Sequence, residues 1–196
     1  FGSKFRILYP FFFKAIKQIK VSNDVQLIVS SSHSVAKGVK KSNKNQIHIS
    51  YFQAPNSNYI WQDAPLYFKK AYPLVKWLLP VFRKWDYTQA QNPDFIICNS
   101  KFVQNWVKMN YKRKSIVIYP PVNLKAFPLK NEKQDFYVVA GRMATIKRFD
   151  LVIEAFNINK KRLMVIGDGE ELEYLKSIAT SPNIEFLGFQ NVEVLS

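Results

Sequence analysis

The chain has 196 residues, enough for one complete domain and part of a second. Hydrophobic residues make up 47% of it and aromatic residues 15%, a composition that excludes an intrinsically disordered protein. Its single cysteine, Cys98, allows no disulfide within the chain and favours a reducing, cytoplasmic location.

The net charge of +15 is unevenly distributed along the chain. Residues 1–130 carry 21 Lys and Arg against 4 Asp and Glu, whereas residues 131–196 carry 8 against 10. A basic half of this kind is attracted to anionic lipid, phosphorylated acceptors or nucleic acid. A composition that is rich in lysine throughout explains the same excess without any partner, so both interpretations stay open.

The first half of the chain begins with an amphipathic helix that we expect after Pro10. Residues 25–34 and 47–55 are apolar runs that end in small or polar residues, the pattern of buried strands that lead into loops. Residues 64–92 are aromatic and basic, and we expect two helices there, interrupted near Pro73 and Pro80.

From residue 94 onward, predicted strands and helices alternate. The strands are 94–100, 115–122, 135–142, 162–169 and 184–189, and the helices are 101–111, 149–157 and 170–179. This alternation predicts parallel βαβ units and an α/β fold. Continuous apolar runs such as YVVA and LMVIG predict strands that are buried on both faces of their sheets. Three prolines in PPVNLKAFPLK and the change in charge place a domain boundary near Phe127, giving domains 1–127 and 128–196.

The strongest chemical motif is AGRMATIKRF, in which a predicted strand leads into Gly141 and Arg142, with Lys147 five residues later. Ligands of open parallel sheets bind at the carboxyl ends of the strands. Gly141 permits a close backbone approach, Arg142 offers a planar fork of donors to phosphate oxygens, and Lys147 adds a point charge. Two basic residues on an ordinary surface loop would have the same spacing.

A second glycine pair, Gly167 and Gly169 in VIGDGEE, follows another predicted strand. The third glycine of a dinucleotide fingerprint is absent, and Glu173 occupies its position. Asp168 is a candidate helix N-cap, and Glu170 and Glu171 complement the helix dipole. A plain strand-to-helix turn explains the motif without any ligand.

The motifs together, and in this order, resemble family 4 retaining glycosyltransferases of the GT-B type. AGR-x4-K-R, VIGDGEE and NIEFLGF resemble their donor-binding domain, and SSHSVAKGV, HISYFQAP, DFIICNSKF and IVIYPPV resemble their acceptor domain, particularly in bacterial polysaccharide mannosyltransferases. The resemblance implies two Rossmann-like domains, both incomplete in this chain, the first without its initial strand. It also implies transfer of a hexose, with mannose the first candidate, from a nucleoside-diphosphate sugar to a glycan or lipid-linked acceptor.

The resemblance assigns expected roles to particular residues. Gly141, Arg142 and Lys147 match the group that binds the donor diphosphate, and no metal or cofactor is expected because the two cations stabilise the leaving group. Gly167, Gly169 and Phe189 match the nucleotide side. On the acceptor side Asn99 and Ser100 match the strand-end pair that faces the cleft, and His33 and Gln53, at two other predicted strand ends, are further candidates. The resemblance assigns no residue of this chain as catalytic.

Two departures from the family pattern matter for activity. Gln53 stands where relatives have a histidine near the transferred sugar, and an amide cannot titrate near neutral pH. The carboxylate pair E-x7-E that holds the donor sugar is not recognised, because Glu185 and Glu193 have the spacing but not the context. We therefore expect a fragment cut at both ends that is inactive by itself. An epimerase of the same architecture is the first alternative.

The aromatic and basic residues of 64–92 suit a helix at an anionic membrane interface, and a lipid-linked acceptor would make such contact useful. A helix whose rings pack against its own domain is an equally good interpretation. A nucleic-acid-binding module is a weaker alternative, because the basic residues are scattered over several predicted units and no nucleic-acid motif is recognised. We expect no nucleic-acid partner.

Overall fold

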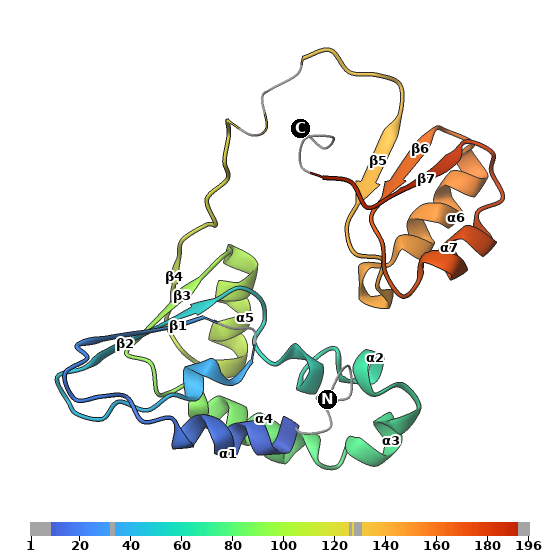
Figure 1. The fold of residues 1–196 in the computed structure, drawn as a ribbon. Coiled ribbons are helices and arrows are strands. Elements are labelled where there is room, and N and C mark those ends of the chain that lie inside the picture. The colour runs from blue at the N-terminus through green and yellow to red at the C-terminus, as the bar shows by residue number, and fades with distance from the viewer. Residues whose placement is uncertain (1–8, 32–33, 126, 128–130, 192–196) are drawn as a thin grey trace. The chain divides into compact units, whose positions relative to one another are not determined.

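The computed structural model describes the chain except for residues 1–8, 32–33, 126, 128–130 and 192–196. The chain divides into two compact units, residues 1–121 and 122–196, each of which has its own parallel sheet (Figure 1). This division lies a few residues before the boundary that the sequence predicts near Phe127.

The first unit contains a four-stranded parallel sheet. Its strands β1 (Leu27–Ser31), β2 (Ile47–Phe52), β3 (Phe95–Cys98) and β4 (Ile116–Val117) pair in chain order. Helix α5 (Lys101–Tyr111) packs against one face of this sheet, where Phe52, Ile96, Cys98, Val103, Trp106, Val107 and Tyr111 form a buried core. The strands and the helix predicted in this part of the chain are confirmed.

A second core of the first unit lies among short helices. They are α1 (Tyr9–Gln18), η2 (Val35–Gly38), η3 (Asn58–Ile60), α2 (Ala64–Phe68), η4 (Lys69–Ala71), α3 (Tyr72–Val75) and α4 (Leu79–Gln89). Phe13, Ile60, Ala64 and Leu79 are its buried centre. The expectation of two helices in 64–92 is wrong in detail, because Pro73 and Pro80 lie in the first turns of α3 and α4. Proline is tolerated there, since the first backbone N–H groups of a helix have no partner within it.

Within the part of the chain that the structure describes, no helix is long and apolar enough to cross a bilayer.

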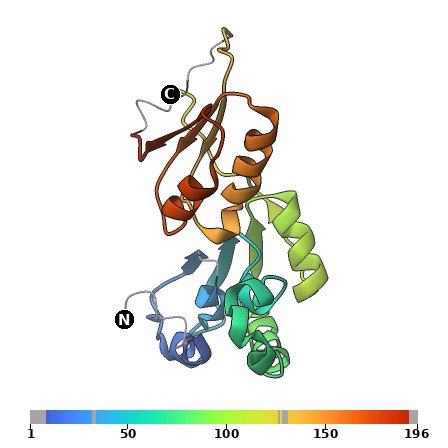
Figure 2. The ribbon, with the colours of Figure 1, turned by 90° about the vertical axis from the view of Figure 1, so that its right-hand side faces the viewer.

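The second unit is a three-stranded parallel sheet with its helices on one face. Strands β5 (Tyr137–Ala140), β6 (Leu163–Ile166) and β7 (Ile184–Gly188) pair in that order. The short helix η5 (Thr145–Lys147) and helix α6 (Phe149–Asn159) connect β5 to β6, and α7 (Leu172–Ile178) connects β6 to β7. The turned view shows α6 and α7 in front of the sheet (Figure 2). Their buried contacts involve Met143, Phe149, Ile153, Leu163, Val165 and Leu175.

The expectation that the apolar strands are buried on both faces is correct for β6 and wrong for β5. Leu163, Val165 and Ile166 of β6 are buried, whereas Tyr137 and Val138 of β5 are about half exposed. Strand β5 is an edge strand of the described sheet, so Tyr137 on the helix side is covered only in part, by Phe156 of α6, and Val138 lies on the opposite face. The first unit shows the same one-sided burial, with Val29 and Phe95 exposed on the face opposite α5.

Candidate functional site

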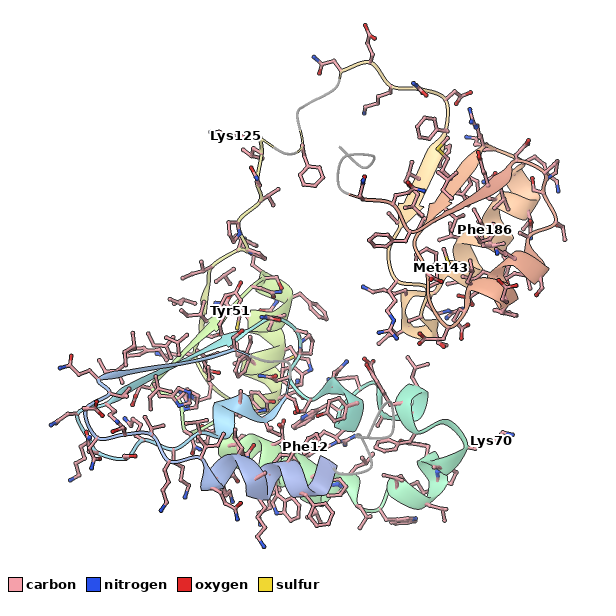
Figure 3. The ribbon with its side chains drawn as sticks, in the orientation of Figure 1. Phe12, Tyr51, Lys70, Lys125, Met143 and Phe186 are labelled. Atoms are coloured by element: carbon pink, nitrogen blue, oxygen red, sulfur yellow. The ribbon has the colours of Figure 1, made fainter. Side chains whose placement is uncertain are left out.

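The backbone of the loop after β5 is held in place at the carboxyl end of the sheet. Gly141 has φ +154°, a conformation that favours glycine, and its N–H donates to the Ile166 carbonyl at 3.0 Å. Two residues later the Met143 side chain is completely buried in the core beneath the loop (Figure 3). Arg142 lies between these two anchors and its side chain is 75% exposed. The fold therefore fixes the backbone on both sides of Arg142 and leaves its guanidinium in solvent.

The Gly-Asp-Gly turn after β6 packs directly against this loop. A Cβ at Gly167 would overlap the Gly141 carbonyl, and a Cβ at Gly169 would overlap the Met143 carbonyl. Backbone hydrogen bonds join the same two segments, from Met143 N–H to the Asp168 carbonyl at 2.9 Å and from Glu171 N–H to the Met143 carbonyl at 3.1 Å. The two glycines are thus required by the approach of one backbone to another, whether or not a ligand is bound.

The carboxyl end of β7 also contacts the Gly-Asp-Gly turn, through Gly188, the last residue of the strand. The Gly167 N–H donates to the Gly188 carbonyl at 2.8 Å, and Gly188 has φ +67°. The next residue, Phe189, has 81% of its surface exposed. The loops that carry Gly141, Gly167 and Gly169 therefore lie together, and Phe189 follows directly from the strand end bonded to them.

Two of the three cations in the loop after β5 already pair with carboxylates. The Arg142 guanidinium lies 3.0 Å from a Glu170 carboxylate oxygen, in a pair whose side chains are both more than half exposed. Arg148 donates three hydrogen bonds to Asp150 and holds the pKa of that carboxyl below its usual value. Among the described residues, Lys147 pairs with no carboxylate. Lys147 is thus the cation of this loop that is available to an anion without any exchange of partners.

The turn after β6 differs from its predicted details. Asp168 is not the N-cap of α7, because its carboxylate accepts a hydrogen bond from the adjacent Gly169 N–H at 2.7 Å and Glu171 occupies the N-cap position. Glu171 instead accepts a hydrogen bond from the Thr145 hydroxyl at 2.9 Å, which ties η5 to the start of α7. A hollow of about 190 Å³ adjoins this contact, lined by Ala144, Thr145, Phe149, Asp150, Glu171, Tyr174 and Leu175.

A second group of polar residues meets at the carboxyl ends of β1, β2 and β3. The Gln53 side-chain amide donates to the Ser31 hydroxyl at 2.9 Å, and the Asn99 side-chain amide donates to the Gln53 carbonyl. The Ser100 hydroxyl accepts a hydrogen bond from Val103 N–H at 3.3 Å and caps α5. The structure therefore brings Gln53 and Asn99 together and gives Ser100 a capping role. His33 lies outside the described residues.

A buried carboxylate below these strand ends was not predicted from the sequence. Asp86 on α4 is fully buried and accepts from Lys37 Nζ at 2.7 Å, Ser57 Oγ at 2.9 Å, Trp61 Nε1 at 2.8 Å and the Tyr111 hydroxyl at 2.6 Å. These five side chains are called the Asp86 cluster below. They come from four separate segments, with Ser57 and Trp61 in one loop, so no local spacing could have revealed the whole cluster.

The Asp86 cluster ties two strand-end loops to one helix. Lys37 also donates to the Ser34 carbonyl at 2.8 Å, which anchors the loop after β1, while Ser57 and Trp61 anchor the loop after β2. Burial lowers the pKa of Lys37, and the adjacent Asp86 carboxylate opposes that effect. The signal available in the sequence was a Lys within VAKGV and the one acidic residue of the segment 64–92, Asp86.

Among the residues that the structure describes, no group of three or more His, Cys, Asp or Glu side chains is placed to hold a metal ion.

Comparison with known proteins identifies the class to which the second unit is similar. Residues 123–196 match the model of the family described as glycosyl transferases group 1. An uncharacterized glycosyltransferase of Methanocaldococcus jannaschii is 34% identical over 101 residues, which is 50% of this chain and 28% of that protein. The chain thus spans less than a third of the length of this curated relative.

Solved structures show the fold, which is α/β of the GT-B type. HepE of Anabaena, solved in complex with UDP, aligns over 96% of this chain and 54% of its own, with a TM-score of 0.61 and 14% identity. A TarM variant of S. aureus, solved with fondaparinux, alpha-GlcNAc-glycerol and UDP, aligns over 76% of this chain and 30% of its own, with a TM-score of 0.53 and 16% identity. At such identities the likeness concerns the fold alone.

Proposed function

We propose that the chain contributes the donor-diphosphate site of a glycosyltransferase that uses a nucleoside-diphosphate sugar. The observation that carries the proposal is the loop after β5, whose buried anchors hold Arg142 and Lys147 in solvent beside the Gly-Asp-Gly turn. Similarity to the glycosyl transferases group 1 model over residues 123–196 supports it, as does the UDP bound to HepE and to TarM.

The chemistry that these residues would perform is stabilisation of a leaving group. In the proposed reaction the bond from the sugar C1 to the diphosphate oxygen breaks and a bond from C1 to an acceptor hydroxyl oxygen forms. The nucleoside diphosphate leaves with the negative charge, and the hydroxyl proton is released. Arg142 and Lys147 would bind the diphosphate oxygens and stabilise the charge that develops on them. In this proposal the nucleotide sugar is a substrate, and no cofactor is required.

The Glu170 contact does not oppose this assignment. An exposed ion pair contributes only about 0–1 kcal/mol, whereas a diphosphate offers Arg142 several charged acceptors at once. The incoming ligand would therefore replace Glu170 as the partner of Arg142.

The finer features of the reaction remain part of the proposal. They are a hexose donor with mannose as the first candidate, retention at C1, a glycan or lipid-linked acceptor, and a cytoplasmic location. Gln53 and Asn99 are the described side chains that we assign to the acceptor side, because they lie together at the carboxyl ends of β2 and β3. The fully buried Cys98, whose thiol pKa is raised by burial, is compatible with a reducing location.

Binding of a nucleoside diphosphate tests the donor site without requiring turnover. Arg142→Ala should weaken the binding of UDP or GDP, whichever binds, roughly tenfold to a hundredfold in calorimetry, because one charge-assisted contact contributes about 1.5–3 kcal/mol. The matched control is Arg162→Ala, since Arg162 is similarly exposed in the same unit but precedes β6 at the opposite edge of the sheet. Equal affinities for wild type and Arg142→Ala would contradict the assignment.

A further inference from the structure

The helical segment 72–89 presents a row of exposed apolar side chains, at whose end Trp85 also contacts the Phe13 ring of α1, with 5.7 Å between the ring centres. Its most exposed large side chains are Leu74 at 81% and Trp77 at 77%, and they are accompanied by Leu78, Val81 and Trp85 at 43–53%. These five residues are called the exposed stripe below. They recur at intervals of three, one, three and four residues, and the backbone stays in the right-handed helical region at Lys76 and Leu78. This is the spacing of one side of a helix.

The same segment also has a packed side. The exposed stripe is therefore not the side through which the segment joins the core of its unit. Tyr72, Val75 and Phe82 pack against the second core of the first unit, and Leu79 is buried in its centre. One set of apolar residues thus packs into the core of the first unit, and a second set stays partly or largely exposed to solvent. The interpretation in which apolar side chains of 64–92 pack against their own domain is therefore confirmed for the packed set, and contact with a membrane stays a prediction for the exposed set.

Cations surround the exposed stripe, and acidic residues do not. Residues 64–85 contain no Asp or Glu, and Asp86 is fully buried in its cluster. Lys70, Lys76 and Lys84 are exposed, and Lys70 points away from the fold at the end of the helical region (Figure 3). Helix α1 packs against α4 and adds exposed Lys14 and Lys17.

One contact joins the apolar and the charged groups. The Lys76 ammonium lies 5.1 Å from the centre of the Trp77 ring, so a cation sits beside the most exposed ring of the stripe. Tryptophan rings occupy the boundary between hydrocarbon and headgroups, and lysine stems extend along apolar surface while the ammonium stays in the polar layer. This pairing of groups matches an anionic lipid surface better than it matches the apolar core of a protein interface, from which lysine is depleted.

We propose that the exposed stripe and its flanking lysines form a binding surface for an anionic lipid bilayer. The stripe would enter the boundary between headgroups and acyl chains, with Lys70, Lys76 and Lys84 at the level of the phosphates. The surface belongs entirely to the first unit, so the proposal goes beyond the donor site and holds whichever sugar or nucleotide is used.

The test is sedimentation of the whole chain with vesicles of phosphatidylcholine, with and without phosphatidylglycerol, in the absence of nucleotide. Wild type should bind the vesicles that contain phosphatidylglycerol, and high salt should weaken the binding. Leu74→Ser with Trp77→Ser should lower the affinity roughly tenfold or more, because each apolar group enters the boundary region. Lys76→Ala with Lys84→Ala should lower it roughly tenfold or more for anionic vesicles, at about fivefold per lysine.

Matched controls come from α5 of the same unit. Phe102→Ser with Met109→Ser removes two apolar side chains that are 70% and 62% exposed, and Lys101→Ala with Lys108→Ala removes two exposed cations. Both control variants should keep wild-type affinity. Trp77→Phe should keep binding but reduce the quenching of tryptophan fluorescence by brominated lipid to the part that comes from Trp85, the less exposed tryptophan of the stripe. The far-ultraviolet circular dichroism of each variant checks that the fold is retained.

Three results would overturn the proposal. The first is a wild-type chain that stays in the supernatant with anionic vesicles. The second is a loss of binding in the α5 controls as large as in the stripe variants. That result would indicate that the chain binds vesicles through its general positive charge and not through the exposed stripe. The third is self-association of the lipid-free chain that Trp77→Ser abolishes while vesicle binding is unchanged, which would make the stripe a protein interface.

Discussion

Glu170 controls the electrostatic environment of Arg142 in the unliganded protein. Its carboxylate pairs with the guanidinium at 3.0 Å and places a negative charge where we propose that diphosphate oxygens bind. Both side chains are largely in water, so the pair itself contributes little to stability. The consequence of this contact should therefore be seen in binding rather than in folding.

Glu170→Gln is expected to strengthen nucleoside-diphosphate binding by up to about fivefold, because it removes a competing partner of about 0–1 kcal/mol. Calorimetry with the nucleotide that binds wild type measures the change. Glu173→Gln is the control, since Glu173 is exposed on α7 and pairs with Lys176 instead. A weaker affinity in Glu170→Gln would mean that the carboxylate itself holds the ligand.

The residues of the candidate site differ in how far the sequence predicted their placement. Gly141, Gly167 and Gly169 were predicted at strand ends, and the structure adds that Gly167 and Gly169 are required by backbone contacts between two loops. The Arg142–Glu170 pair could not be predicted, because the two residues lie on loops 28 positions apart. The diphosphate role of Arg142 and Lys147 stays a prediction.

At the scale of elements, α4 is held to both strand-end loops of the first unit by the Asp86 cluster. A buried carboxylate and a buried ammonium each carry a large desolvation cost, which their mutual contact and the extra hydrogen bonds offset. Removing one partner leaves the other charge buried without compensation. The cluster is therefore a point at which a single substitution should loosen several elements together.

Asp86→Ala is expected to destabilise the first unit by about 3–5 kcal/mol, the usual cost of an uncompensated buried charge. All four tryptophans lie in residues 1–121, so tryptophan fluorescence during urea unfolding reports this unit. Glu173→Ala, which removes an exposed partner in the second unit, should leave the fluorescence transition unchanged. A shift below about 1 kcal/mol for Asp86→Ala would contradict the importance given to the cluster.

His48 on β2 should make the stability of the first unit depend on pH. Burial lowers the pKa of its imidazole below the ordinary 6.5, against the opposing effect of Asp94 and with a smaller contribution from Lys41. Its ring bonds the Ser30 hydroxyl at 2.8 Å, and its backbone N–H donates to Asp94. The folded protein therefore holds a neutral imidazole at a pH where the unfolded chain already takes up a proton.

Below about pH 6.5 the unfolded state binds more protons than the folded state, so stability falls as the pH falls towards the folded pKa. We expect the free energy of unfolding to decrease by up to about 1.4 kcal/mol per pH unit in that window. His48→Gln should flatten this dependence in fluorescence-monitored urea unfolding. His33→Gln measures the contribution of the chain's other histidine. Equal pH slopes in wild type and His48→Gln would disprove the linkage.

At the scale of the whole molecule, residues 122–136 connect two separately packed units. The described part of this segment is almost entirely exposed and contains no helix or strand. It contrasts with the exposed loop 40–46, in which Gln46 accepts from Ser42 N–H and donates to the Ser22 carbonyl. Both segments contain lysines, but the loop 40–46 is held by the two hydrogen bonds of the Gln46 side chain.

Trypsin is expected to cut this chain first after Lys125 or Lys133, because exposed backbone outside helices and strands fits a protease most easily. Mass spectrometry of a short digestion should give two resistant fragments that correspond to the two units. Lys40 and Lys44 in the bonded loop are the internal comparison. First cleavage at those lysines, or simultaneous degradation of both units, would contradict the independence of the two folds.

By itself the sequence determined the alternation of strands and helices and the α/β class, because apolar runs, glycines and caps are local signals along the chain. Only the tertiary structure decided which faces stay exposed and which distant groups meet. The Asp86 cluster joins residues as far apart as Lys37 and Tyr111, and the stripe of Leu74 and Trp77 differs from its packed neighbours only by the side of the helix. Burial and long-range pairing depend on how elements pack, and local spacing does not contain that information.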